Sequence, residues 1–162
     1  MKLRKLEIKD APLMLAWMHD ENVTKNMAAN FAAKTIDDCL AFISSTKSDT
    51  KNCHLAIVDE NDRYMGTVSL KNITNRTAEF AITVSSEAMG KGFSKYAIQE
   101  IIRIGTEEKK LQFIYWYVSE KNARAVRFYD KNGYKRVNVD DLDVNEDLLP
   151  KNKYDYLWYI NE

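Results

Sequence analysis

A pair of glycines lies between a strand-like segment and a helical one, where the backbone itself could bind an anion. Residues 78–84 alternate apolar and polar side chains, as a strand does, and from Phe93 onward apolar side chains recur every three or four residues, as in an amphipathic helix. Gly90 and Gly92 let the intervening backbone turn sharply and approach a ligand. The first N–H groups of a helix have no partner within it and lie at the positive end of the helix dipole, so this layout favours a phosphate.

The glycine pair alone does not identify the ligand, because short connections also use glycine simply to turn. The spacing Gly-Lys-Gly-Phe-Ser lacks the third glycine of a dinucleotide fingerprint and the Gly-Lys-Ser/Thr ending of a Walker loop. Lys91 and Lys95 could place positive charge beside a phosphate, although exposed lysines in such positions are usually solvated.

A second group of polar residues lies on a shorter helix expected over residues 122–131. Asn122, Val126 and Tyr129 are spaced i, i+4 and i+7 and therefore share one face, and Gly133 supplies the helix stop. From the residues alone, Asn122 is more simply an N-cap and Tyr129 a core aromatic.

The two segments together resemble the GNAT acetyltransferase superfamily. Residues 84–94, V-S-S-E-A-M-G-K-G-F-S, are similar to its Arg/Gln-x-x-Gly-x-Gly/Ala motif, and residues 118–134 are similar to its V-x-x-x-N-x-x-A-x-x-x-Y-x-K-x-G-F segment. The resemblance covers essentially the whole chain and is strongest to the branch with ribosomal-protein N-terminal and spermidine acetyltransferases. Met89 replaces the usual Arg or Gln, and Ser94 replaces Gly or Ala.

The resemblance implies an acetyl-CoA site. Backbone groups around Val84 would bind the pantetheine, the segment from Met89 to Ser94 would surround the pyrophosphate, Asn122 would contact the pantetheine arm, and Tyr129 would hydrogen-bond the thioester sulfur and protonate the leaving thiolate. Because Met89 lacks a charge, we expect binding mainly through backbone amides. The expected acetyl-CoA residues are Ile82, Val84, Met89, Gly90, Lys91, Gly92, Phe93, Ser94, Lys95, Asn122 and Tyr129.

Acetyl transfer to an amine needs a neutral amine, yet an alkylammonium has a pKa of about 10.4. Glu79 is the candidate base: it lies on the strand before the glycine loop, and the resembling branch often has Glu there. It could instead pair with Arg76 or be hydrated. His54, Trp17 and Trp116 could line an acceptor pocket, although His and aromatic residues in apolar runs are more often core.

The remaining sequence predicts the elements that position these residues. An antiparallel meander of three strands leads into the glycine loop, and the helix after it should return the chain to a parallel neighbouring strand. A capping box at Thr35 begins a short amphipathic helix. The fold class is α/β (α+β), a mixed, mostly antiparallel sheet of six or seven strands flanked by helices. The expected strands are residues 3–8, 54–58, 64–70, 78–84, 111–118, 134–139 and 154–160.

Composition limits the protein's partners. The chain has 162 residues with 24 Lys and Arg against 24 Asp and Glu, so it lacks the positive field of a general nucleic-acid binder. Two cysteines and two histidines suggest neither a disulfide framework nor a metal site. Because no repeat, linker, signal peptide or membrane helix is evident, we expect one domain over residues 1–162, located in the cytoplasm. We expect no nucleic-acid or membrane partner, and a homodimer is the assembly to test.

The sequence thus predicts an N-acetyltransferase that moves acetyl from acetyl-CoA directly to a primary amine of a small molecule or peptide. An aminosugar or its nucleotide conjugate, a polyamine and a protein N-terminus all stay open as acceptors. The acidic run 140–147 could attract a cationic acceptor, or be only a solvated loop. The alternative function is a non-catalytic CoA-binding or partner-binding module.

Overall fold

A computed structural model describes all 162 residues and contains one seven-stranded sheet. The strand order is β1-β2-β3-β4-β5-β7-β6, and every neighbouring pair except β4 and β5 is antiparallel. This confirms the mixed, mostly antiparallel sheet. The strands are β1 (Lys2–Lys5), β2 (Cys53–Val58), β3 (Tyr64–Lys71), β4 (Thr77–Val84), β5 (Phe113–Ser119), β6 (Lys135–Val137) and β7 (Tyr156–Asn161).

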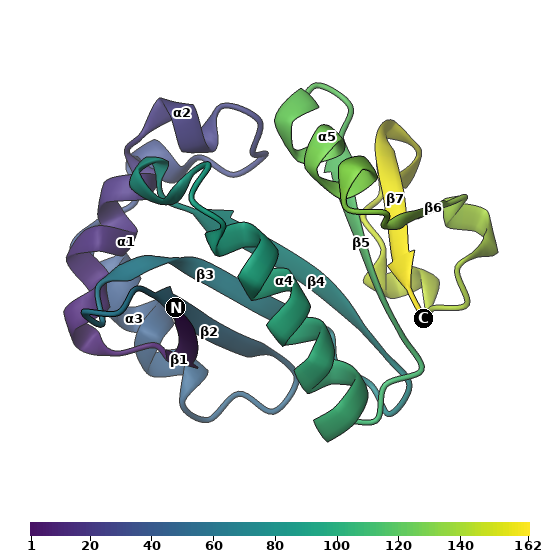
Figure 1. Ribbon diagram of the computed structural model, residues 1–162, viewed down its shortest axis with the longest axis horizontal. Helices are drawn as coiled ribbons and strands as arrows, with labels where there is room; N and C mark the ends of the chain where they lie inside the picture. The colour runs from purple at the N-terminus through teal and green to yellow at the C-terminus, as the bar shows by residue number, and fades with distance from the viewer.

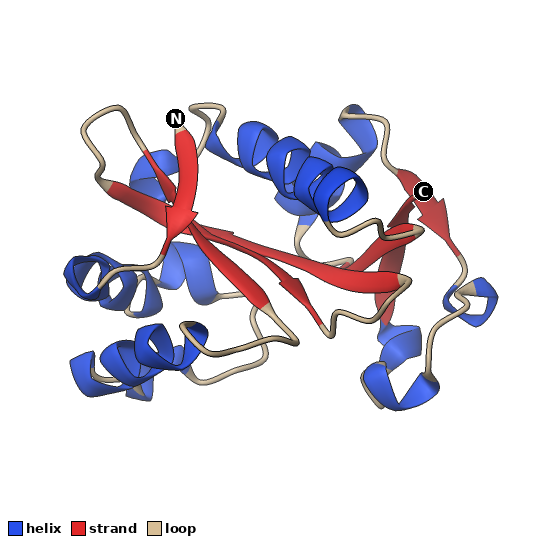
Figure 2. Cartoon of the chain, turned by 90° about the horizontal axis from the view of Figure 1, so that it is seen from below, coloured by secondary structure: helices blue, strands red, loops and turns tan.

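Helices cover both faces of the sheet, as the edge-on view in Figure 2 shows. On one face, α4 buries Phe93, Ala97, Ile98 and Ile101 against the central strands, and α5 adds Tyr129 to the same core cluster. On the other face, α1 and α3 pack over β2 and β3 in a second cluster. The helices are α1 (Ala11–Met18), α2 (Glu21–Thr24), α3 (Ile36–Thr46), α4 (Phe93–Arg103) and α5 (Ala123–Lys131).

Helix ends follow the expected local chemistry. The Thr35 side chain accepts from the Asp38 backbone N–H while the Asp38 carboxylate accepts from the Thr35 backbone N–H, so the capping box of α3 is formed. Gly133 follows α5 with φ of 78°, the left-handed conformation that glycine adopts without a steric penalty.

The first strand is shorter than expected because a buried carboxylate ties the chain back on itself. Asp10 accepts two hydrogen bonds of 2.8 Å from the Arg4 guanidinium and one of 2.8 Å from the Glu7 backbone N–H. Asp10 is also the N-cap residue of α1, but its side chain makes no cap bond there. The strand ends at Lys5, and a short turn of helix leads into α1 instead. No helix is long and apolar enough to span a membrane.

The parallel contact between β4 and β5 is short. Only Thr77, Ala78 and Glu79 of β4 have partners on β5, namely Phe113, Ile114 and Tyr115. Beyond Glu79 the two strands diverge, as Figure 1 shows, while β4 remains paired to β3 as far as Val84. The sheet is therefore open along one edge of the second half of β4.

Candidate active site

A cleft of about 1340 Å³ lies where β4 and β5 diverge. Phe80, Ile82 and Val84 of β4 line one side of it, and Trp116 and Val118 of β5 line the other. Alternate residues of a strand direct their N–H and C=O groups to the same side, so the open half of β4 offers backbone donors and acceptors that no strand uses. An extended polar chain such as pantetheine can bind along such an edge.

The N-terminus of α4 opens on the same cleft. Gly90 and Gly92 have φ of 75° and 86°, and Gly92 is the N-cap of α4. The first helical N–H to find a backbone partner is that of Tyr96, which donates to the Gly92 carbonyl at 3.1 Å. The amides of residues 93–95 are therefore left for a ligand. This arrangement fits the expected pyrophosphate site.

Only some of the predicted residues in this loop direct their side chains into the cleft. Met89, Ser94 and Lys95 line it, together with both glycines. Lys91 does not line it, and the side chain of Phe93 is packed in the core at 6% exposure, so Phe93 can serve the site only through its backbone.

Helix α5 brings Asn122 and Tyr129 to the opposite side of the cleft. The Asn122 carboxamide oxygen accepts from the Ala125 backbone N–H at 3.2 Å, so this residue is an N-cap whose amide nitrogen remains free for a ligand. Tyr129 is 7% exposed, with its ring centroid 5.5 Å from that of Trp116 and 5.1 Å from that of Tyr159. Tyr159 donates its hydroxyl to Asp130, whereas no protein group bonds the hydroxyl of Tyr129.

Burial, with smaller contributions from Tyr159 and Tyr134, raises the pKa of Tyr129. Its hydroxyl is therefore protonated at neutral pH and has a proton to donate. Because no protein group bonds this hydroxyl, it is free to hydrogen-bond a leaving thiolate in the cleft and to protonate it.

Glu79 lies at the point where β4 and β5 separate. It is 5% exposed, and its Oε2 is 2.9 Å from the Lys71 ammonium, which lies directly opposite on β3. Both residues line the cleft. The expected alternative partner, Arg76, instead pairs with Asp143 at 2.9 Å. Glu79 is thus a buried carboxylate held in an ion pair with the half-buried Lys71 beside the cleft.

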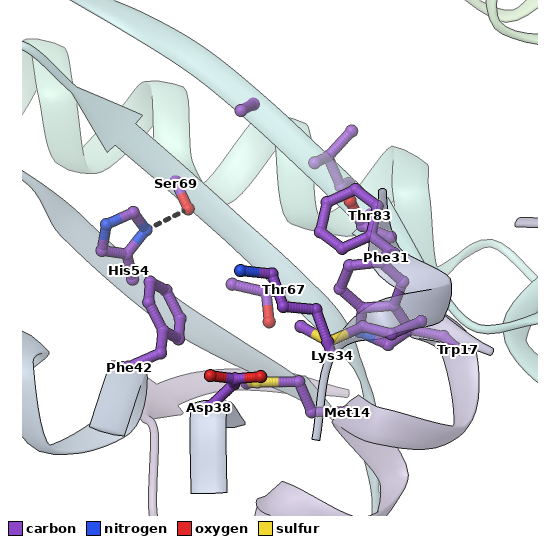
Figure 3. A pocket seen from close by; sticks show the side chains of 13 residues that line it. Met14, Trp17, Phe31, Lys34, Asp38, Phe42, His54, Thr67, Ser69 and Thr83 are labelled. Atoms are coloured by element: carbon purple, nitrogen blue, oxygen red, sulfur yellow. Dashed lines mark hydrogen bonds between the residues drawn. The ribbon is translucent and has the colours of Figure 1, made fainter. Parts of the chain in front are cut away.

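A smaller pocket of about 290 Å³, here called the side pocket, lies between α1, α3 and the opposite face of the sheet. Figure 3 shows His54 and Phe42 at one end of it and Trp17 and Phe31 at the other. His54 and Trp17, proposed from the sequence as acceptor-pocket residues, are therefore in a pocket, whereas Trp116 is 1% exposed and lines the cleft. The thirteen lining residues are Met14, Trp17, Met18, Phe31, Lys34, Asp38, Phe42, His54, Thr67, Ser69, Ala81, Ile82 and Thr83.

Residues 1–135 match the family model of the acetyltransferase (GNAT) domain, which is most of the chain and includes the cleft residues of β4, α4 and α5. This chain belongs to the GNAT acetyltransferase family. It is an N-acetyltransferase that takes its acetyl group from acetyl-CoA, as the sequence motifs predicted.

Curated relatives of this acetyltransferase are distant. The spermidine N(1)-acetyltransferase of Vibrio cholerae is 26% identical over 137 residues, covering 82% of this chain and 77% of that protein. The acetyltransferase PseH of Campylobacter jejuni is 21% identical over 129 residues, covering 80% and 79%. The crystal structure of spermidine N-acetyltransferase from V. cholerae in complex with CoA and spermine superposes with a TM-score of 0.79 at 22% identity, covering 99% of this chain and 94% of that one. That likeness establishes the shared fold.

Three features of this acetyltransferase's cleft were not predicted from the sequence. Lys71 is the partner of Glu79. Arg124 on α5 places its guanidinium against the Met89 sulfur, so a cation from another element lies where the glycine loop lacks one. Residues 22, 23 and 25–29, in α2 and the segment after it, form part of the cleft wall.

Two other expectations concern groups away from the cleft. The acidic run 140–147 does not line the cleft or the side pocket, and its Asp143 and Glu146 pair with Arg76 and Lys153. No group of three or more His, Cys, Asp or Glu side chains is placed to hold a metal ion.

Proposed function

We propose that this acetyltransferase transfers acetyl directly to a primary amine of a small molecule or peptide, with Tyr129 and Glu79 as its catalytic residues. The observation that carries the proposal is the opening between β4 and β5. It brings an open strand edge, free helix amides and the unbonded Tyr129 hydroxyl to one cleft. A donor with a phosphate at one end and a thioester at the other matches this order of groups.

The binding roles follow the geometry of the cleft. The amides after Gly92 would hold the pyrophosphate, with Ser94 and Lys95 beside it. Backbone groups from Ile82 to Val84 would bond the pantetheine along the open edge of β4. The free amide nitrogen of Asn122 would reach the same arm from α5. Lys91 and the side chain of Phe93 are left out of this arrangement.

The transfer needs one proton removed and one supplied. The amine nitrogen attacks the thioester carbonyl, the carbon–sulfur bond breaks, and Tyr129 would donate its proton to the departing sulfur. Glu79 would take the proton that the amine loses, directly or through a water molecule. Lys71, at 2.9 Å from Glu79 Oε2, would hold this carboxylate in position beside the cleft.

The relatives indicate the class of acceptor. Two of the relatives are named for spermidine or spermine, so a small-molecule amine is the coarse class of acceptor. An aminosugar, a polyamine and a protein N-terminus are the specific candidates. Three further predictions remain: residues 1–162 form one acetyltransferase domain, the protein is a homodimer, and it acts in the cytoplasm.

A thiol-release assay with acetyl-CoA tests the proposal. The purified chain is incubated with acetyl-CoA and a panel of aminosugars, polyamines, monoamines and N-terminal peptides, and the released CoA thiol is followed with a thiol reagent. We expect release above the amine-free rate with at least one amine class. CoA binding without thiol release in the presence of any amine would refute the catalytic proposal. CoA binding itself is measured from the melting temperature, because a ligand at 100 times its Kd adds about 2.7 kcal/mol to the free energy of unfolding.

A further inference from the structure

The side pocket adjoins the cleft at β4, where acetyl transfer is proposed to occur. Phe31, Ala81 and Thr83 line both spaces. Ala81 and Thr83 share the face of β4 that carries Glu79, because successive side chains of a strand alternate between its faces. A molecule in the side pocket would therefore extend one end toward the transfer site and the candidate base.

The walls of the side pocket are mainly apolar and aromatic. The ring centroids of Trp17 and Phe31 are 5.1 Å apart in an edge-to-face arrangement at one end, and Phe42 packs against His54 at 5.0 Å at the other. Met14 and Met18 add flexible apolar surface. The pocket's 290 Å³ is about twice the roughly 150 Å³ of an engineered apolar cavity that binds benzene. One aromatic ring with a short side chain fits this space.

Most polar groups around the side pocket already have partners inside the protein. Trp17 Nε1 donates to the Tyr64 hydroxyl at 3.1 Å, and that hydroxyl lies 2.7 Å from Thr67 Oγ1. His54 Nδ1 is 2.6 Å from Ser69 Oγ. Burial lowers the pKa of His54, with weaker opposing influence from Asp49, so the ring is neutral at pH 7. The pocket offers little to a ligand that needs many hydrogen bonds.

Charges near the pocket cancel. On its rim are one cation, Lys34, and one anion, Asp38, whose carboxylate already accepts from the Thr35 N–H at 2.8 Å and the Thr35 hydroxyl at 3.1 Å. In the adjoining cleft, Lys71 neutralises Glu79. A polyamine brings further ammonium groups beyond the one acetylated, and burying an ammonium without its own carboxylate is costly. The four side chains sum to zero charge, so they supply no excess of carboxylates for additional ammonium groups.

We infer that the acceptor is a primary monoamine carried on a single aromatic ring by a short alkyl chain, and that the side pocket binds the ring. This inference rests on the proposed amine acetylation and narrows it to one substrate class. The ring would pack among Trp17, Phe31 and Phe42, and the amine would emerge at Ala81 and Thr83. The inferred acceptor also differs from the polyamine for which the spermidine acetyltransferase relatives are named.

The first test compares 2-phenylethylamine with spermidine and glucosamine in the thiol-release assay. We expect kcat/KM for 2-phenylethylamine to exceed that for each of the other two at least tenfold. If spermidine or glucosamine is the better acceptor, the substrate class is wrong while amine acetylation stands. If no amine releases thiol, the proposed function fails, and calorimetric titration of 2-phenylethylamine into the CoA complex then decides whether the side pocket binds such a ring.

Two variants tie the preference to the pocket. Ala81→Leu places a branched side chain in the pocket and should raise the KM, or the calorimetric Kd, of 2-phenylethylamine at least tenfold, whereas Ala32→Leu, at an exposed position outside the pocket, should not. Lys34→Glu makes the rim acidic and should raise the spermidine-to-phenylethylamine ratio of kcat/KM at least tenfold, with Lys34→Gln between it and wild type. Thermal stabilisation by CoA shows that each variant is folded. The inference is wrong if Ala81→Leu leaves the KM and Kd of 2-phenylethylamine unchanged. It is also wrong if Lys34→Glu leaves the spermidine-to-phenylethylamine ratio of kcat/KM unchanged.

Discussion

Replacing Tyr129 with Phe separates its proposed chemistry from its packing. The ring is buried against Trp116 and Tyr159 at centroid distances of 5.5 and 5.1 Å, and a phenylalanine ring keeps those contacts. Because the hydroxyl bonds no protein group, its loss should change the free energy of unfolding by no more than about 0.5 kcal/mol. A positioned general acid contributes roughly 10²–10⁴ to a rate, or about 2.7–5.4 kcal/mol. Tyr129→Phe should therefore lower kcat at least about a hundredfold with little change in stability.

Tyr159→Phe is the matched control, because the two rings are in contact but only Tyr159 uses its hydroxyl inside the protein. That hydroxyl donates to Asp130 at 2.9 Å and helps to lower the pKa of Asp130, after the larger effect of Arg136. The control should lower the melting temperature and leave most of kcat. The measurements are initial rates at saturating acetyl-CoA, CoA affinity by calorimetry and thermal denaturation. Unchanged kcat in Tyr129→Phe, or an equal loss of kcat in both variants, would show that this hydroxyl is not the acid.

Three further predictions concern the cleft and the pocket. Arg124→Ala should weaken CoA binding about tenfold in calorimetry, as loss of one charge-assisted phosphate contact does, while Lys91→Ala should change it less than twofold; the reverse order would place the missing cation in the loop. Gly66→Ala should lower the free energy of unfolding, measured with denaturant, by about 1–3 kcal/mol, because the new Cβ would lie 2.3 Å from the Thr83 carbonyl oxygen. Unchanged stability would show that β3 and β4 can separate there. His54 has a lowered pKa in the fold and an ordinary one of about 6.5 when unfolded, so the unfolded chain binds more protons and stability should fall as pH drops below about 6.5. His54→Gln should flatten that fall, and an identical slope in the variant would contradict it.

Local signals in the sequence predicted the elements that carry the cleft. The alternation over residues 78–84, the apolar period of α4 and the glycine pair each depend on neighbours within one or two turns of chain, and the structure has all three. The capping box of α3 is equally local. The first strand was predicted too long, because its end depends on Asp10 meeting Arg4 rather than on strand propensity. Boundaries set by tertiary contacts are not visible in local patterns.

Contacts between side chains far apart in the sequence could not be predicted from local patterns either. Lys71 faces Glu79 because the turn over residues 72–76 fixes the register between β3 and β4, and a shift of one residue would turn the lysine to the opposite face. Arg124 reaches Met89 only because α5 and the glycine loop lie on facing sides of the cleft. The substitution at Met89 could be read in the sequence, whereas the cation beside it could not.

The position of Glu79 links the shape of the sheet to its proposed chemistry. Glu79 is the last residue of β4 that pairs with β5, opposite Tyr115, so it lies where the sheet begins to open. Before it, both edges of β4 are used in the ladder; after it, one edge is free for the extended arm of a ligand. A base at this junction stays buried by the paired half of the sheet while it borders the open half. The divergence of the two strands would therefore create the donor site and place the base beside it. Lys71 of β3 supplies the ion-pair partner that positions this carboxylate.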